Sequence, residues 1–333
     1  MDVKEILAKR KAPVMEKVME FIGDGEPTLL YDMMREYPNR PGKGVRPALV
    51  MIATEAYGRD TSQSIITAAA LELFQNWVLI HDDIEDESDE RRGKPCLHHM
   101  HGIPLAINAG DALHIKMWEA LDRNSEIMGD EKDRAIKAKM AEMLSRVVEG
   151  QTMELSWVHS KNWDVTEEDY YIMIYKKAAW YTTIAPIQFG AIIAGAGNLQ
   201  AIHDFGEALG KAFQLQDDIL NLIADEKYGK EIAGDIYEGK RTLILIHLMK
   251  NCSPEEKEKV LAIMNKERED KTEEEVQYVL GLMKEKGSID YAIAAAKAYA
   301  DKAKELFPGL ELSDGPATDE LKAIVDYIIE REL

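Results

Sequence analysis

The stretch 68-AAALELFQNWVLIHDDIEDESDERRGKP-95 decides the fold, because a long apolar segment leads directly into acidic and then basic residues. Apolar side chains occupy nearly all faces of this segment, which favours a central, buried helix over about 62–87. At about 3.6 residues per turn, Asp82 and Asp86 lie one turn apart and leave the same face. Like charges at this spacing destabilise a helix slightly unless a cation lies between them. The DDxxD pattern therefore predicts a magnesium site for a phosphorylated ligand.

A second acidic stretch lies far downstream, at 213-FQLQDDILNLIADEKYGKEIAGDIYEGKRTL-243. Asp217 and Asp218 open it, and Asn221 follows one turn later. Basic residues come next, as they do after the first stretch. One acidic patch alone is commonly a solvated helix face. Two such patches, each followed by lysines and arginines, are hard to obtain by chance, so the pair favours a functional site over two solvated faces.

Composition excludes several function classes. The 333 residues include 41 basic and 61 acidic side chains, a formal charge of −20, which disfavours binding to nucleic-acid phosphates. The two cysteines, Cys96 and Cys252, stand in no metal-binding spacing, so a reducing compartment is expected. The first residues lack the apolar core of a signal peptide, and the most apolar run, 184–197, is too short for a bilayer. We therefore expect a cytoplasmic protein with no transmembrane segment.

Apolar residues recur at spacings of three and four along most of the chain, which predicts helices. The expected helices are 3–22, 45–57, 62–87, 103–128, 133–158, 167–194, 199–224 and 242–250. Thr166, Ser253 and Thr272 each precede an acidic first turn, as N-caps do. No alternating strand pattern and no Gly-, Ser- or Pro-rich linker stands out. The prediction is an all-α protein with a single domain over residues 1–333.

Together with 42-GKGVRP-47, the two acidic stretches resemble the trans-isoprenyl diphosphate synthases, which include farnesyl, geranylgeranyl and longer-chain polyprenyl synthases. The resemblance extends over essentially the whole chain and is clearest from 41 to 242. It implies the isoprenoid synthase fold, a bundle of roughly ten or more helices around a central cavity, with Mg2+ as cofactor and a homodimer as the assembly. The implied reaction joins isopentenyl diphosphate to an allylic diphosphate (dimethylallyl, geranyl or farnesyl) by ionisation, condensation and proton loss.

Carried over position by position, the resemblance implies three groups of residues. The magnesium ligands are Asp82, Asp86 and Asp217, supported by Asp83 and Asp218. The allylic diphosphate is bound by Arg91, Lys177 and Lys240, with Lys230 close by. Isopentenyl diphosphate is bound by Lys43, Arg46, Gln75 and Arg92, and Gln214 faces the developing cation with the segment 177–181. Each Lys or Arg taken singly is more often a solvated surface residue.

Four positions depart from the family pattern: Asn221 replaces a common Asp, Ala178 a Thr, Glu154 an Asp, and Cys96 a small hydroxyl residue. None of these changes removes a group that the resemblance assigns to metal or substrate. We therefore expect the chain to be active.

Two other readings remain open besides a prenyl diphosphate synthase. A terpene cyclase shares the aspartate-rich helix, but it usually carries a different second metal motif and does not need GKxxRP. A non-catalytic partner subunit of a synthase typically loses its aspartates, whereas both acidic stretches are intact here.

Product length depends on side chains that close the cavity in which the prenyl tail grows. In the family, the residue five positions before DDxxD commonly sets its floor, and here that residue is Trp77. It is followed by the small Val78. One aromatic residue instead of two favours geranylgeranyl diphosphate (C20), with farnesyl diphosphate (C15) as the alternative. An ideal helix places Trp77 about 140° from Asp82, however, so Phe74 is the next candidate.

Overall fold

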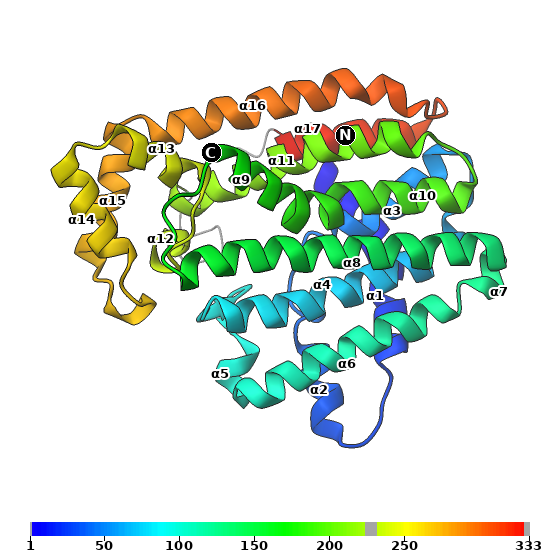
Figure 1. Ribbon diagram of the computed structural model, residues 1–333. Coiled ribbons are helices and arrows are strands. Elements are labelled where there is room, and N and C mark those ends of the chain that lie inside the picture. The colour runs from blue at the N-terminus through cyan, green and yellow to red at the C-terminus, as the bar shows by residue number, and fades with distance from the viewer. Residues whose placement is uncertain (1, 224–231, 330–333) are drawn as a thin grey trace.

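The computed structural model describes residues 2–223 and 232–329, and nearly all regular structure in this part of the chain is helical, as predicted. Helix α4 (Ile65–Glu85) lies inside the bundle, against α1 (Val3–Ile22), α3 (Val45–Ala56) and α6 (Ile103–Asp122) (Figure 1). Every side chain of α4 from Ile66 to Asn76 is buried. The expectation of a central helix is therefore confirmed.

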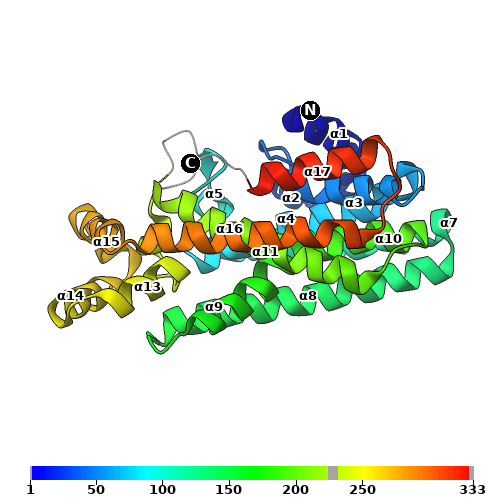
Figure 2. The ribbon, with the colours of Figure 1, turned by 90° about the horizontal axis from the view of Figure 1, so that it is seen from above.

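The other helices extend this bundle toward both ends of the molecule (Figure 2). In chain order, the first of them are α2 (Thr28–Glu36), η1 (Thr61–Gln63), α5 (Leu97–His101), α7 (Ser125–Met128), α8 (Asp130–His159) and α9 (Glu167–Ile174). They continue with α10 (Ala185–Ala194), α11 (Leu199–Ile223), α12 (Gly234–Tyr237), α16 (Ser288–Leu306), η5 (Phe307–Leu310) and α17 (Pro316–Ile329). Helix α16 runs along α11 and returns the chain across the bundle.

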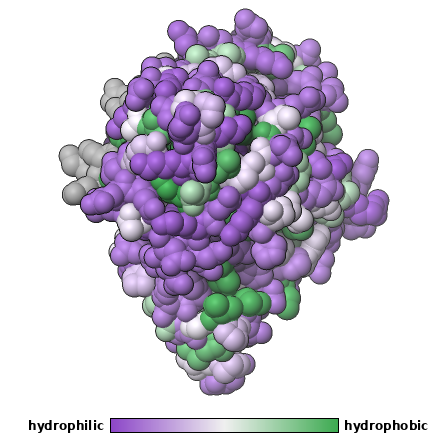
Figure 3. Space-filling model, turned by 60° about the vertical axis from the view of Figure 1, so that its left-hand side comes forward, coloured by the Kyte–Doolittle hydropathy of each residue, from purple (hydrophilic) through white to green (hydrophobic). Residues whose placement is uncertain are grey.

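Helices α13 (Leu243–Asn251), α14 (Pro254–Met264) and α15 (Glu273–Glu285), with η4 (Arg268–Asp270), gather at one end of the molecule, at the left of Figure 1. They share a buried apolar cluster with α9 and the second half of α11, separate from the cluster around α4. The surface at this end is mostly hydrophilic, with small apolar patches (Figure 3). No helix in the described ranges has the length and apolarity to span a membrane.

Several element boundaries differ from the prediction. Helix α4 starts three residues later than expected and ends at Glu85, so Asp86 is its C-cap, because Glu87 adopts a left-handed conformation (φ 53°) that stops the helix. The expected helix 103–128 is two helices, since the chain turns at Arg123 and Asn124. A short hairpin of β1 (Glu90–Arg91) and β2 (Lys94–Pro95) follows α4. The predicted N-caps at Thr166, Ser253 and Thr272 are all confirmed as capping boxes.

The predicted helix 167–194 is interrupted by a π-helix, η2 (Tyr175–Ile184). Glycines of two neighbouring helices lie against it. A Cβ at Gly150 of α8 would lie 2.8 Å from the Cα of Lys177, and one at Gly210 of α11 would overlap Ala179. The absence of these side chains lets both helices approach the backbone of η2 closely. Such π-helical insertions frequently occur at functional sites.

Candidate active site

The carboxylates of the first acidic stretch face two lysines that come from distant parts of the chain. Lys240 donates a hydrogen bond to Asp86 Oδ2 at 2.8 Å. The Nζ of Lys177, on the π-helix, lies 3.5 Å from Asp82 Oδ1, and Gln151 of α8 donates to the same oxygen at 3.2 Å. The fold thus brings together four of the residues that the sequence singled out.

Glu154 of α8 completes this group as the ion-pair partner of Lys177. Its side chain is buried, and burial alone would raise the pKa of Glu154. The charges of Lys177 and Lys240 outweigh burial, so the pKa of Glu154 lies below its ordinary value. The departure from Asp to Glu therefore leaves a charged carboxylate in contact with Lys177.

The cluster holds more negative charge than its lysines balance. The pKa of Asp86 is raised to about 7, chiefly by burial and then by the charges of Asp82 and Glu238, against the opposing charge of Lys240. Glu238 also pairs with Lys240, at 2.5 Å. A buried carboxylate is stabilised in its charged form by a nearby cation. The site therefore has the electrostatics of one that accepts an additional positive charge.

The second aspartate of each motif is held by a buried tyrosine. Asp83 is fully buried and accepts hydrogen bonds from the hydroxyl of Tyr37 and from Arg91, whose Nε lies 2.7 Å from Asp83 Oδ1. Asp218 accepts one from the hydroxyl of Tyr170 at 2.6 Å. Neither tyrosine was predicted, because each lies more than 45 residues from its aspartate, Tyr37 at the end of α2 and Tyr170 in α9.

These bonds fix two predicted substrate-binding groups. Arg91 is bonded to Asp83, and its guanidinium reaches to 3.5 Å from Asp82 Oδ2. Gln214 donates to Asp218 Oδ1 at 2.8 Å, one turn along α11. Arg91 thus lies beside the first acidic motif, and Gln214 beside the second.

The second acidic stretch connects to the first through shared charges. Burial alone would lower the pKa of Lys240, but nearby carboxylates raise it well above its ordinary value. These carboxylates are Asp86, Glu238, Glu154 and Asp235. Asn221 lacks the charge of a third carboxylate, and its Oδ1 accepts a hydrogen bond from the backbone N–H of Asp235 at 3.1 Å. Lys230 lies outside the described residues.

The residues predicted for the second diphosphate form a separate basic group. Arg92 packs on Gly42, where a Cβ would lie 3.2 Å from the Arg92 Cζ. Arg46 lies over the ring of Tyr181 at 4.2 Å, and its Nε is buried without a partner among the described residues. Gln75 is buried with its Oε1 also unpartnered there. Lys43 is exposed in the adjoining loop.

The loop that carries Lys43 is tied to α1. Lys11 donates to the carbonyl of Gly42 at 2.9 Å, and its stem packs against Gly44, which has φ 66°. Lys11 was not predicted, because nothing in the first helix marks it as a partner of this loop.

A row of rings runs from this basic group to α6. Tyr181 and Phe74 meet edge to face at 5.8 Å, Phe74 and Trp77 at 5.6 Å, and Trp77 stacks on His114 at 4.1 Å. Trp77 thus faces α6 and not the aspartates, in line with the helical-wheel estimate. Val78 is half-buried. The sequence did not point to His114.

The oxygen donors fit a divalent cation. Magnesium is commonly held by one or two carboxylates together with substrate phosphates and waters. Asp82 and Asp86 lie beside each other in the buried acidic cluster, with the amide of Gln151 next to them. Within residues 2–223 and 232–329, no group of three His, Cys, Asp or Glu side chains encloses a metal position by itself.

Comparison with known proteins covers nearly the whole chain. A family model described as polyprenyl synthetase matches residues 27–283. A short chain isoprenyl diphosphate synthase of Methanothermobacter thermautotrophicus is 35% identical over 335 residues, covering 100% of this chain and 99% of that protein. A geranylfarnesyl diphosphate synthase of Natronomonas pharaonis is 30% identical, covering 99% and 98%.

The crystal structure of a geranylgeranyl pyrophosphate synthetase from Pyrococcus horikoshii is similar in fold as well as in sequence. It matches with a TM-score of 0.87 and 37% identity, covering 99% of this chain and 98% of that one. The family model, these relatives and the lysine–aspartate cluster agree, and the chain belongs to the polyprenyl synthetase family.

Proposed function

We propose that the protein is a magnesium-dependent prenyltransferase that condenses isopentenyl diphosphate with an allylic diphosphate, head to tail, to give a short-chain all-trans product. The observation that carries this proposal is the buried cluster in which Asp82 and Asp86 meet Lys177 and Lys240. Polyprenyl synthetases use divalent metal ions. The direct test is mass analysis of the products formed from isopentenyl diphosphate with C5, C10 and C15 primers. A prenyl chain lengthened by five carbons per step is expected, whereas a cyclic hydrocarbon would indicate a terpene cyclase.

The arrangement suits ionisation of an allylic diphosphate. The ammonium groups of Lys177 and Lys240 would bind the departing diphosphate, and Asp82, Asp86 and Asp217 would hold the metal. Bound magnesium would supply Lewis-acid stabilisation of the leaving group. Fixed charges of this kind, directed at developing charge, usually make the largest contribution to catalysis. The row of aromatic rings from Tyr181 to His114 would lie beside the carbocation and exclude water from it.

The two diphosphates are expected to use different basic groups. Because Arg46 and Arg92 lie beside the 41–44 loop, Arg46→Ala or Lys43→Ala should raise KM mainly for isopentenyl diphosphate, by about 10-fold or more for each lost charge-assisted contact. Lys177→Ala should instead lower kcat or weaken the allylic substrate. Steady-state kinetics with each substrate varied in turn measures this. Equal effects of the two substitutions on the same substrate would contradict the partition.

We further propose geranylgeranyl diphosphate as the main product, with farnesyl diphosphate as the alternative. The stacked pair Trp77 and His114 would close the cavity for the tail. Trp77→Ala removes the bulkiest ring and should shift products toward longer chains by at least one C5 unit, as chromatography of dephosphorylated products would show. Trp157→Ala, which removes a half-buried indole elsewhere, is the control. If a folded, active Trp77→Ala variant gave the same products as wild type, Phe74 would be the next candidate for the residue that limits product length.

A homodimer is proposed from the family and from an exposed apolar face. Large apolar side chains of α5, α6 and α8 lie at the surface of the single chain: Met100, Ile103, Leu105, Ile107, Ile115 and Val148. Apolar patches of this kind mark protein interfaces. A cytoplasmic location is proposed from the cysteine usage.

Ile115→Asp should turn the dimer into a monomer at micromolar concentration, because a carboxylate would be buried without a partner. Light scattering measures the mass. Ile172→Asp makes the same change at an exposed position of α9 and should leave the dimer intact. A stable, active wild-type monomer would refute the proposed assembly.

A further inference from the structure

A cavity of about 470 Å3 lies at the end of the molecule formed by α13 and α14, and the chain segment before α9 also borders it. Its apolar lining comes from Trp163, Val165, Leu245, Ile246, Met249, Cys252 and Pro254. Its charged lining is Arg241, Lys250 and Lys257, with no acidic side chain among the described residues that line it. It is unexpected that all the charged lining residues are basic in a chain of net charge −20.

Arg241 is the least compensated of these cations. It is only 3% exposed, and its guanidinium lies over the Trp163 ring at 4.1 Å from the centroid. Its Nε donates to the carbonyl of Asn162 at 3.1 Å and its Nη1 to that of Gly239. Its Nη2 has no acceptor among the described residues, and burial lowers the pKa of Arg241 to about 10. No carboxylate of the described residues pairs with it, so the buried charge is balanced only by carbonyl dipoles and the indole face.

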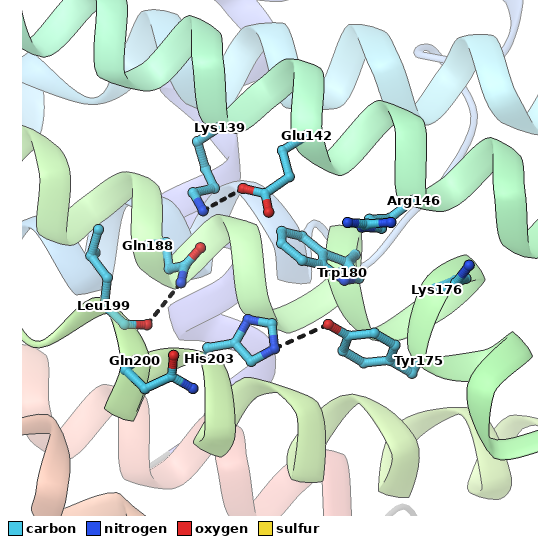
Figure 4. A pocket seen from close by; sticks show the side chains of 10 residues that line it. All are labelled: Lys139, Glu142, Arg146, Tyr175, Lys176, Trp180, Gln188, Leu199, Gln200 and His203. Atoms are coloured by element: carbon cyan, nitrogen blue, oxygen red, sulfur yellow. Dashed lines mark hydrogen bonds and ion pairs between the residues drawn. The ribbon is translucent and has the colours of Figure 1, made fainter. Parts of the chain in front are cut away.

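A second cavity in this protein provides a comparison, because the cations that line it are paired with carboxylates. It lies between α8, the π-helix, α10 and α11, has a volume of about 460 Å3, and is also lined by three cations (Figure 4). Each of them has a carboxylate partner. Lys139 pairs with Glu142 at 2.6 Å, and Lys176 and Arg146 pair with Glu149 at 2.8 and 3.0 Å. The cavity at Arg241 differs, since only Lys250 is paired there, with Glu167 at 2.8 Å.

We infer that the cavity at Arg241 is a second anion-binding site, for a phosphate or diphosphate ester that carries a short apolar group. The guanidinium and Lys257 would bind the anion, and Leu245, Ile246 and Val165 would contact the apolar part. Arginine is the side chain best suited to phosphate at a buried site. The inference rests on the proposed function in one respect: the esters are taken to be prenyl diphosphates, the substrates and products of the proposed reaction.

Occupation of this site would reach the active site through the backbone. Arg241 directly follows Lys240, which pairs with Asp86, and its Nη1 bonds to Gly239. An anion that shifts the Arg241 guanidinium therefore acts on the segment that positions Lys240. The expected consequence is inhibition by prenyl diphosphates at concentrations above those that saturate the active site.

The test is calorimetric titration of the full chain with geranyl diphosphate in excess EDTA, with inorganic pyrophosphate and geraniol as separate ligands. Because the cavity binds through a guanidinium and not a metal, a site that depends on Arg241 should persist in EDTA and should prefer geranyl diphosphate over both fragments. No metal-independent binding would overturn the inference, and equal affinity for pyrophosphate would overturn the assignment of an apolar part.

Variants locate the site. Arg241→Gln should weaken this binding about 10-fold or more, and Arg241→Lys should restore part of it. Because Arg241→Gln could also perturb folding, Lys257→Gln at the exposed mouth is the second variant, with an expected loss of about threefold. Lys259→Gln lies on the same helix but outside the lining, and should bind as wild type does. Equal affinities of Lys257→Gln, Arg241→Gln and wild type would refute the site.

Asp82→Ala separates this inference from the proposed function. It damages the active site and should leave the metal-independent binding unchanged. A wild-type chain that binds geranyl diphosphate through Arg241 but forms no prenyl product would refute the proposed reaction and leave the anion site standing.

Discussion

Replacing Asp82 by alanine should lower kcat by about 10^3-fold, the loss typical when one fixed electrostatic group is removed from a buried site. Asp82 is a predicted metal ligand, and it also lies beside Lys177 and Arg91, which are predicted to bind the allylic diphosphate. Its carboxylate lies 3.5 Å from Lys177 and 3.5 Å from Arg91, and it accepts a hydrogen bond from Gln151. Steady-state kinetics with saturating substrates and magnesium measures the effect.

The fold should survive this substitution. Lys177 keeps Glu154 as its partner, and Arg91 keeps Asp83, so neither buried cation is left uncompensated. Far-ultraviolet circular dichroism and the melting temperature should therefore stay close to wild type. Asp301→Ala removes the same group from an exposed position on α16 and should leave kcat unchanged. Wild-type turnover by Asp82→Ala, or by wild-type enzyme in excess chelator, would contradict the assignment of Asp82 to the metal.

Gly150→Ala should lower kcat by about 100-fold, because displacement of a catalytic group by roughly 1 Å is enough for such a loss. A Cβ at this position would lie 2.8 Å from both the Cα and the Cβ of Lys177. The backbone of the π-helix must then move away from α8. The ammonium group of Lys177 would move with it, away from Asp82 and Glu154. Overpacking of this kind should also destabilise the fold by about 1–3 kcal/mol.

A matched control separates the contact from the general effect of the substitution. Gly281→Ala makes the same change within α15, where a Cβ would meet nothing within 4 Å. Since alanine favours a helix over glycine by about 0.8–1.0 kcal/mol, this variant should be slightly more stable than wild type and fully active. Thermal unfolding and kcat, measured on both variants, give the comparison. If Gly150→Ala behaved as Gly281→Ala does, close packing against the π-helix would not position Lys177.

The two competing readings make different predictions for the same experiments. A non-catalytic partner subunit would show no turnover in any variant, with or without magnesium. A terpene cyclase would consume an allylic diphosphate without needing isopentenyl diphosphate. The separate basic group of Arg46 and Arg92 has no role in a reaction with one diphosphate substrate. Dependence of turnover on isopentenyl diphosphate therefore distinguishes both alternatives from a synthase.

The sequence by itself determined the helices and the face that carries the first aspartates. Helical periodicity and capping act over one or two turns, so the N-caps at Thr166, Ser253 and Thr272 and the burial of α4 could be predicted locally. The relation of Asp82 to Asp86 is also local. Motif order then indicated the family, because the residues that bind diphosphates recur in a fixed sequence.

Tertiary structure alone decided what surrounds these residues. The bonds from Tyr37 to Asp83 and from Tyr170 to Asp218, the pairing of Glu154 with Lys177, and the stack of Trp77 on His114 join helices far apart in the chain. No local pattern encodes such pairs, because they depend on how helices pack. The π-helix has the same origin, since it lies against glycines of two other helices. The unpaired charge of Arg241 likewise emerges only when the fold buries it away from every carboxylate of the described residues.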